Sequence, residues 1–132
     1  MNPHINIGHD CSISLPNTAT LTAGNHVVSF AFDDCRIQAG DGSFVQCRDR
    51  CSMILGANSN IDAGNNSTIQ TGPDSNVIVG PGSVVSAGDN SEIRFTWWFG
   101  NKLEVTVCRI GKNGILANTP YKIIDGRINV VN

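Results

Sequence analysis

An eight-residue repeat in the middle of the chain restricts its possible folds more than any other feature. Between residues 59 and 94 the chain reads SNIDAGNN, STIQTGPD, SNVIVGPG, SVVSAGDN and SEIR. Each unit begins with serine and has Ile or Val at its third position, and the first four have glycine at the sixth. Self-similarity at a fixed period predicts an architecture of stacked repeats.

The repeat frame extends over most of the chain, from Pro3 to Trp98. Divided into twelve octads, this span has an aliphatic residue at the third position of eleven units, Ser29 being the exception. The first position is Ser, Cys or Ala in ten units, and the sixth is Gly in eight. This recurrence predicts one continuous structure over residues 3–98 and a different unit over residues 99–132.

Each octad has the pattern of a short β-strand followed by a turn. Strand alternation directs positions one, three and five to one side, and these are small or aliphatic, whereas positions two and four are mostly polar. Glycine at position six, followed by Asn, Asp or Pro-Gly, supplies a tight turn or positive-φ backbone. A helix is excluded because a period of eight departs from a helical face. We predict an all-β fold, a single-stranded β-solenoid of about six coils, each with two strands.

Aromatic residues cluster where the repeat ends, in FTWWFGN, which contains both tryptophans of the chain. The last coil of a solenoid exposes its core and unpaired strand edges unless something covers it. We therefore predict that Trp97, Trp98 and Phe99 plug the end of the core. A platform for a sugar ring is the alternative interpretation of these aromatic side chains.

The sequence pattern of residues 99–132 predicts a β-hairpin or meander that packs on the solenoid as its cap. NKLEVTVCRI (101–110) alternates apolar and polar residues, and GKNG (111–114) is a typical hairpin turn. Two further turn signals, TP (119–120) and DG (125–126), then predict one or two more strands.

The octad pattern fails in VVSFAFDD, where Ser29 takes an aliphatic position and aromatic residues fall outward or at the turn. Phe44 then occupies, one coil later, the position equivalent to Val28. Val28, Phe30, Phe32 and Phe44 are therefore predicted to form an apolar interface patch, because contiguous exposed apolar surface marks contact sites. A one-residue bulge that turns these side chains inward is the alternative.

The sequence contains no pattern typical of an enzyme, whether a phosphate-binding loop, a nucleophile elbow or a zinc-binding helix. Charged residues do gather at the corner beside the apolar patch: Asp33, Asp34, Arg48, Asp49 and Arg50. Stacked on neighbouring coils, they are expected to form solvated ion pairs rather than a catalytic carboxylate pair.

Neither the cysteines nor the histidines are spaced as metal ligands, so we expect no metal and no cofactor. The five cysteines lack CxxC spacing. Cys35 and Cys51 fall on adjacent coils, where packing as small hydrophobes is favoured over a disulfide. His4, His9 and His26 lie in the first two coils, with no acidic ligand placed beside them.

Composition argues against nucleic-acid and membrane partners. The net charge is −2 and only 15% of residues are charged, so nothing favours binding to nucleic acid or to an anionic membrane. No apolar stretch is long enough to cross a bilayer. The first residues, MNPHINIGHD, contain neither a basic region nor an apolar run, and we expect a cytoplasmic protein with free thiols.

The segment AGNNSTIQTGPDSNVIVGPGSVVSAGDNSEI resembles the AGxxSxIx octads of bacterial ice-nucleation proteins, whose repeats also pair into coils of two octads. The resemblance is close between Gly56 and Ile93 and limited to the repeat frame over residues 3–55. It implies a β-solenoid whose ice-active face has rows of Thr-x-Thr. In this chain only Thr20 and Thr22 form such a pair.

These observations predict a non-catalytic β-solenoid that acts as a scaffold or interaction module. We expect a homo-oligomer, a dimer in the simplest case, associating through the N-terminal coil or the apolar patch, or binding another protein. The alternatives are a solenoid that binds or degrades carbohydrate and, as a third function, an ice-binding protein.

Overall fold

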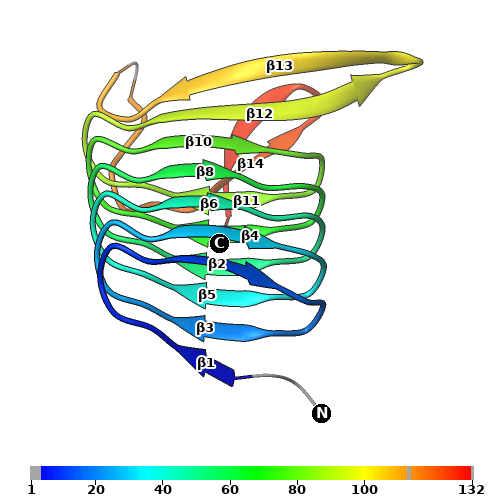
Figure 1. The fold of residues 1–132 in the computed structure, drawn as a ribbon. Coiled ribbons are helices and arrows are strands. Elements are labelled where there is room, and N and C mark those ends of the chain that lie inside the picture. The colour runs from blue at the N-terminus through cyan, green and yellow to red at the C-terminus, as the bar shows by residue number, and fades with distance from the viewer. Residues whose placement is uncertain (1–3, 113, 132) are drawn as a thin grey trace.

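The computed structural model describes residues 4–112 and 114–131, and these residues form fifteen β-strands and no helix (Figure 1). Pro3, the first residue of the predicted solenoid, and Asn113, in the predicted turn, lie outside the described residues. Since the described residues contain no helix, they contain none that is long and apolar enough to cross a membrane.

Twelve strands belong to the repeat and three follow it. The strands of the repeat are β1 (His4–Asn6), β2 (Ser12–Leu15), β3 (Thr20–Thr22), β4 (Val28–Ala31), β5 (Arg36–Gln38), β6 (Phe44–Gln46), β7 (Ser52–Ile54), β8 (Asn60–Asp62), β9 (Thr68–Gln70), β10 (Asn76–Val79), β11 (Val84–Ser86) and β12 (Glu92–Phe99). The last three are β13 (Lys102–Arg109), β14 (Tyr121–Ile124) and β15 (Arg127–Val130).

Successive repeat strands alternate between two parallel sheets that face each other (Figure 1). Sheet A has the order β1-β3-β5-β7-β9-β11-β14-β15, and sheet B has the order β13-β12-β10-β8-β6-β4-β2. Within the repeat, the residues that pair between neighbouring parallel strands are sixteen positions apart, as Leu21 and Ile37 are. The structure confirms the predicted all-β solenoid of about six coils with a small antiparallel unit at its C-terminal end.

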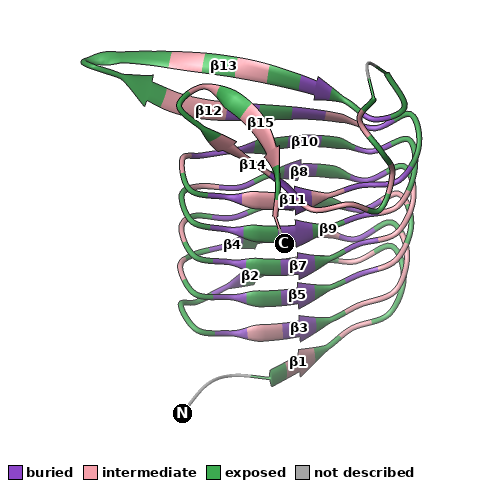
Figure 2. Ribbon diagram, turned by 180° about the vertical axis from the view of Figure 1, so that it is seen from behind, coloured by how far each residue is buried: buried purple, intermediate pink, exposed green. Residues whose placement is uncertain are grey.

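The core lies between the two sheets and is formed by the third position of the octads and its neighbours (Figure 2). On sheet A, the third-position side chains are at most 3% exposed from the second coil to the sixth: Leu21, Ile37, Met53, Ile69 and Val85. Apolar side chains from stacked coils therefore form continuous columns, and this burial is the main driving force for folding.

Serine at position one ties neighbouring coils together inside this core. The Ser75 hydroxyl accepts the backbone N–H of Ser59 at 3.3 Å and donates to the carbonyl of Gly72 at 3.0 Å. The next coil repeats the link, where the Ser91 hydroxyl accepts the Ser75 N–H at 3.1 Å. Backbone hydrogen bonding thus accounts for the buried serines at position one of the octads.

The corners between strands place octad position eight in the left-handed backbone region. Its φ lies between 56° and 79° at Asp10, Thr18, His26, Asp34, Gly42, Arg50, Asn58, Asn66, Asp74, Gly82 and Asn90. Asn, Asp and Gly tolerate this conformation best and occupy most of these positions. The glycine at position six, which the sequence analysis attributes to turn formation, is needed for a different reason.

Glycine at position six lets the backbones of stacked coils approach closely. The corner that follows sheet A has this residue in every coil: Gly8, Gly24, Gly40, Gly56, Gly72 and Gly88. The Gly72 N–H donates to the Gly56 carbonyl at 3.2 Å. A Cβ on Gly72 would lie only 2.8 Å from the backbone nitrogen of Ala57, closer than real Cβ contacts allow.

Ser29 is the exception in the core, and strand β4 keeps its place around it. β4 pairs in register with β2 and β6, which excludes the bulge considered from the sequence. Ser29 is 0% exposed, and its hydroxyl has no hydrogen-bond partner among the described residues. A buried hydroxyl without a partner costs stability.

We expect Ser29→Ala to raise the free energy of unfolding by about 1 kcal/mol, because it removes this desolvated hydroxyl with little change of volume. Ser75→Ala is the matched comparison and should lower stability by about 1–3 kcal/mol, since it leaves the buried Ser59 N–H unpaired. Urea unfolding followed by circular dichroism measures both changes. A loss of stability in Ser29→Ala similar to that in Ser75→Ala would contradict the interpretation of Ser29.

The C-terminal unit adds strands to the end of each sheet separately. β13 pairs antiparallel with the whole length of β12, and the β14–β15 hairpin joins sheet A through Tyr121 opposite Val85. The turn at Asp125 and Gly126 has positive φ at both residues, as the sequence predicts for a tight hairpin. The chain after β13 does not return along β13, contrary to the turn predicted at 111–114, because β14 pairs with β11 on the other sheet.

Candidate interaction surfaces

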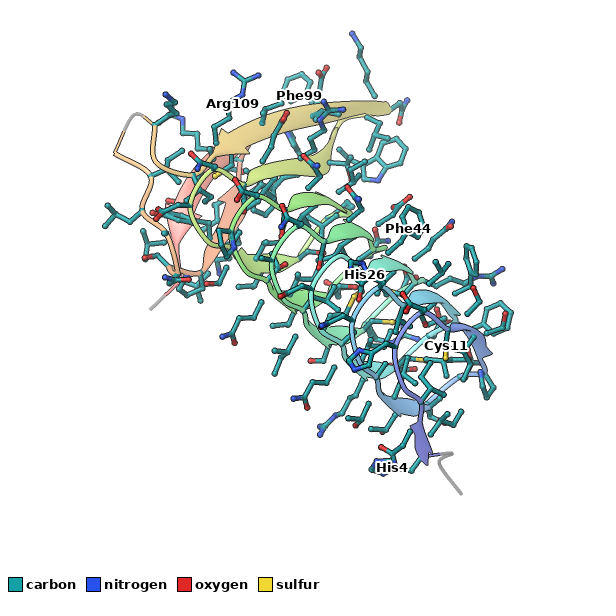
Figure 3. The ribbon with its side chains drawn as sticks, turned by 60° about the vertical axis from the view of Figure 1, so that its left-hand side comes forward. His4, Cys11, His26, Phe44, Phe99 and Arg109 are labelled. Carbon is teal, nitrogen blue, oxygen red and sulfur yellow. The ribbon has the colours of Figure 1, made fainter. Side chains whose placement is uncertain are left out.

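Three of the four residues predicted as an apolar patch, Val28, Phe30 and Phe44, lie on the outer side of sheet B, and Phe32 lies at the corner that follows β4. Phe30 and Phe32 are each 47% exposed, Phe44 is 41% exposed, and Val28 is half-buried. Val28 pairs with Phe44 on the next strand, and the rings of Phe30 and Phe44 are 6.4 Å apart at a tilted angle. Figure 3 shows the Phe44 side chain pointing away from the solenoid body. We call Val28, Phe30, Phe32 and Phe44 the aromatic patch.

A mixed-charge rim borders the aromatic patch at the adjoining corner. The Arg50 guanidinium binds Asp34 through two hydrogen bonds, of 2.9 and 3.2 Å, and lies 3.7 Å from Asp33. Its hydrogen bonding lowers the pKa of Asp34. Arg48 lies over the ring of Phe32 at 4.8 Å. The ion pairs predicted at this corner are therefore present, and as exposed pairs they contribute little to stability.

The three aromatic residues predicted to plug the core are placed differently. Trp98 and Phe99 are 60% and 70% exposed, and Trp97 is half-buried. The reason is that β12 runs on past the corner where the earlier sheet B strands turn, and β13 pairs with this extension (Figure 1). The core is closed instead by the buried side chains Phe95, Cys108, Ile110 and Tyr121.

The outer face of the β12–β13 hairpin forms a second apolar surface that the sequence interpretation missed. Leu103, Val105 and Val107 are between 42% and 53% exposed. They point outward because Cys108 pairs directly with Ile93, and residues directly opposite in an antiparallel pair share a face. The alternation of β13 showed which residues share a face, but not which of its two faces is buried.

The extension of β12 also forms one wall of a groove of about 470 Å³ at the C-terminal end. The Gly80–Ser83 turn and the turn at Asp125 and Gly126 complete it, with Trp97 and Trp98 among the lining residues. The Trp97 indole nitrogen donates to the Thr106 hydroxyl at 2.9 Å, which fixes that ring. Trp98 leaves most of its surface open to solvent.

In the described part of the chain the thiols form no disulfide, and the thiols and histidines form no metal-binding cluster. All five cysteines are free, including the stacked pair Cys35 and Cys51. The pKa of Cys47 is raised mainly by interaction with the Cys51 side chain and secondly by burial. Burial also raises the pKa of Cys108, to about 11. His9 accepts a backbone N–H at 2.8 Å in a turn, and no group of three potential ligands in the described residues could hold a metal ion.

Comparison with known proteins adds no identification. The chain matches no protein-family model, no curated protein and no solved structure. The resemblance to ice-nucleation octads therefore rests on the repeat alone, and the structure adds the β-solenoid of about six coils of about 16 residues. The function has to be inferred from the surfaces of the molecule.

Proposed function

We propose that this protein is a non-catalytic β-solenoid scaffold that self-associates through the aromatic patch of sheet B. The observation that carries this proposal is the grouping of Phe30, Phe32 and Phe44 on a side wall, each more than 40% exposed. Aromatic side chains are the usual anchors of protein interfaces, and a contiguous apolar patch marks a contact site.

A second copy of the chain fits the rim of the patch better than a partner of one charge. The rim presents Arg50 beside Asp33 and Asp34, so both signs of charge lie next to the same apolar centre. A two-fold axis places a surface against itself, and a mixed-charge rim can then bring the cation of one copy toward the anions of the other. The flat wall formed by in-register strands supports such face-to-face packing.

Replacing Phe30 and Phe44 together with serine is expected to weaken self-association by about a hundredfold or more, because truncating central aromatic anchors costs at least about 2 kcal/mol each. Light scattering coupled to gel filtration over a concentration series measures the change. The wild-type chain should migrate as a dimer and the double variant as a monomer with unchanged circular dichroism.

Two control variants locate the interface. Ile54→Ser removes an equally exposed apolar side chain from sheet A and should leave the dimer intact. Val105→Ser tests the second apolar surface on β13. A wild-type chain that stays monomeric at high concentration refutes self-association, and dissociation by Val105→Ser alone would move the interface to the β12–β13 hairpin.

The second candidate function is binding of a neutral sugar in the C-terminal groove. The specific observation is that Trp98 is 60% exposed at the edge of a groove already lined by Trp97. Indole rings stack on the apolar face of a pyranose, and the polar edge of the site can bond its hydroxyls. A glycan array, followed by a titration of Trp98→Ala with any sugar that binds, tests it. Unchanged affinity in that variant would contradict the assignment.

A further inference from the structure

We propose that the outer face of sheet A binds a linear acidic polysaccharide in a trough that crosses β3, β5, β7 and β9. The trough has a volume of about 520 Å³ and lies on sheet A, whereas the aromatic patch lies on sheet B. The strands of sheet A face the viewer in Figure 2. Two rows of outward side chains line it: Thr20, Arg36, Ser52 and Thr68 in one row, and Thr22, Gln38, Ile54 and Gln70 in the other. With strands about 4.8 Å apart, the four strands give the trough a length of about 14 Å.

The face of sheet A is cationic although the protein as a whole is acidic. All eleven Asp and Glu residues lie at corners, on sheet B or in the turn after β14, so the outward positions of sheet A carry none among the described residues. Arg36 lies on β5, and Lys122 and Arg127 lie on the faces of β14 and β15 opposite the core-packed Ile123 and Ile128. This separation of charge selects for an anionic ligand.

Arg36 is the central cation of the trough and is available to a ligand. It is exposed, and among the described residues it has no salt-bridge partner. The neighbouring carboxylate in the sequence, Asp34, is bound by Arg50 at 2.9 Å. The guanidinium fork of an arginine matches the two oxygens of a carboxylate, which favours a uronic acid as its partner.

The rest of the trough offers what a chain of sugar rings requires. The side chains of Thr20, Gln38, Thr68 and Gln70 make no hydrogen bond within the described residues, and each can both donate and accept. Between these polar groups Ile54 is 52% exposed and provides an apolar contact for the C–H face of a ring. The rows run along the solenoid axis, so a linear polymer can lie across successive strands.

Two other classes of polymer, peptides and single-stranded nucleic acids, fit the trough less well. A peptide that adds as a β-strand needs an unpaired sheet edge, whereas β3 to β9 are paired on both sides. A single-stranded nucleic acid needs aromatic platforms for its bases, and the described residues that line the trough include no aromatic side chain.

Titration calorimetry with tetragalacturonic acid tests the proposal directly. We expect the wild-type chain to bind this acidic tetrasaccharide, with an affinity that falls as salt rises, and not to bind the neutral maltotetraose. Arg36→Gln should weaken binding about tenfold or more, because it removes a charge-assisted hydrogen-bond donor. Gln38→Glu, nearly isosteric, should weaken it similarly by placing a carboxylate beside Arg36.

Arg94→Gln is the matched control, since Arg94 is an exposed arginine on sheet B and should leave the affinity unchanged. The proposal is overturned if the acidic tetrasaccharide does not bind at millimolar concentration, or if Arg94→Gln weakens binding as much as Arg36→Gln. Equal affinity for a tetraglutamate peptide would refute the assignment to a sugar. The aromatic patch is not involved, so these outcomes are independent of self-association.

Discussion

Replacing Phe95 with alanine is expected to lower the free energy of unfolding by about 3–5 kcal/mol, the range for truncating a buried aromatic side chain. Phe95 is 1% exposed and is among the largest fully buried side chains of the protein. It belongs to the same core cluster as Cys108 and Tyr121, which come from the two separate parts of the cap. Its removal therefore leaves a cavity where the cap meets the last coil.

The matched comparison for this prediction is Trp98→Ala, three residues along the same strand. Trp98 is 60% exposed, so its removal should change stability by about 0.5 kcal/mol or less. Guanidinium unfolding followed by circular dichroism measures both variants. A larger loss for Trp98→Ala than for Phe95→Ala would show that the exposed aromatic residues, and not Phe95, close the core.

Replacing Gly72 with alanine is the second change with a large expected effect, a loss of about 3 kcal/mol in the free energy of unfolding. The added methyl group would lie 2.8 Å from the Ala57 nitrogen and 2.9 Å from the Gly56 carbonyl carbon, and both are backbone atoms. Because neither can rotate away, the coils have to separate at this corner. That separation lengthens the hydrogen bond from the Gly72 N–H to Gly56.

Gly8→Ala is the control, since Gly8 occupies the same column in the first coil. No atom lies within 4 Å of a Cβ built at Gly8. We expect Gly8→Ala to change stability by about 0.5 kcal/mol or less, because no earlier coil is packed against it in the described residues. Similar losses for the two variants in thermal unfolding would show that the turn conformation, rather than coil stacking, requires glycine at position six.

The fold class could be predicted because the repeat is local and complete. Ile61, Ile69, Val77 and Val85 recur every eight residues, and strand alternation alone places such residues on one side of each strand. Pairing the octads by sixteen also placed Phe44 beside Val28, as the register shows. The aromatic patch was therefore visible in the sequence, whereas its exposure depended on β4 remaining free of a bulge.

The C-terminal unit could be predicted only in part, because no repeat extends into it. The tight turn at Asp125 and Gly126 followed from local backbone preference. The sequence could not show that β14 joins sheet A, or that Trp98 lies beyond the end of the coil. Both depend on pairing between strands that are distant in the chain.

The coils, their columns and the division between inward and outward positions could all be predicted from the sequence, because they follow from alternation and turn chemistry within each octad. The fold was needed to show why Gly72 must be glycine, which face of β13 is buried, and that Arg36 lies in a trough with no carboxylate among its described lining residues. These properties depend on what lies sixteen residues away or on the opposite sheet, and no single octad contains that information.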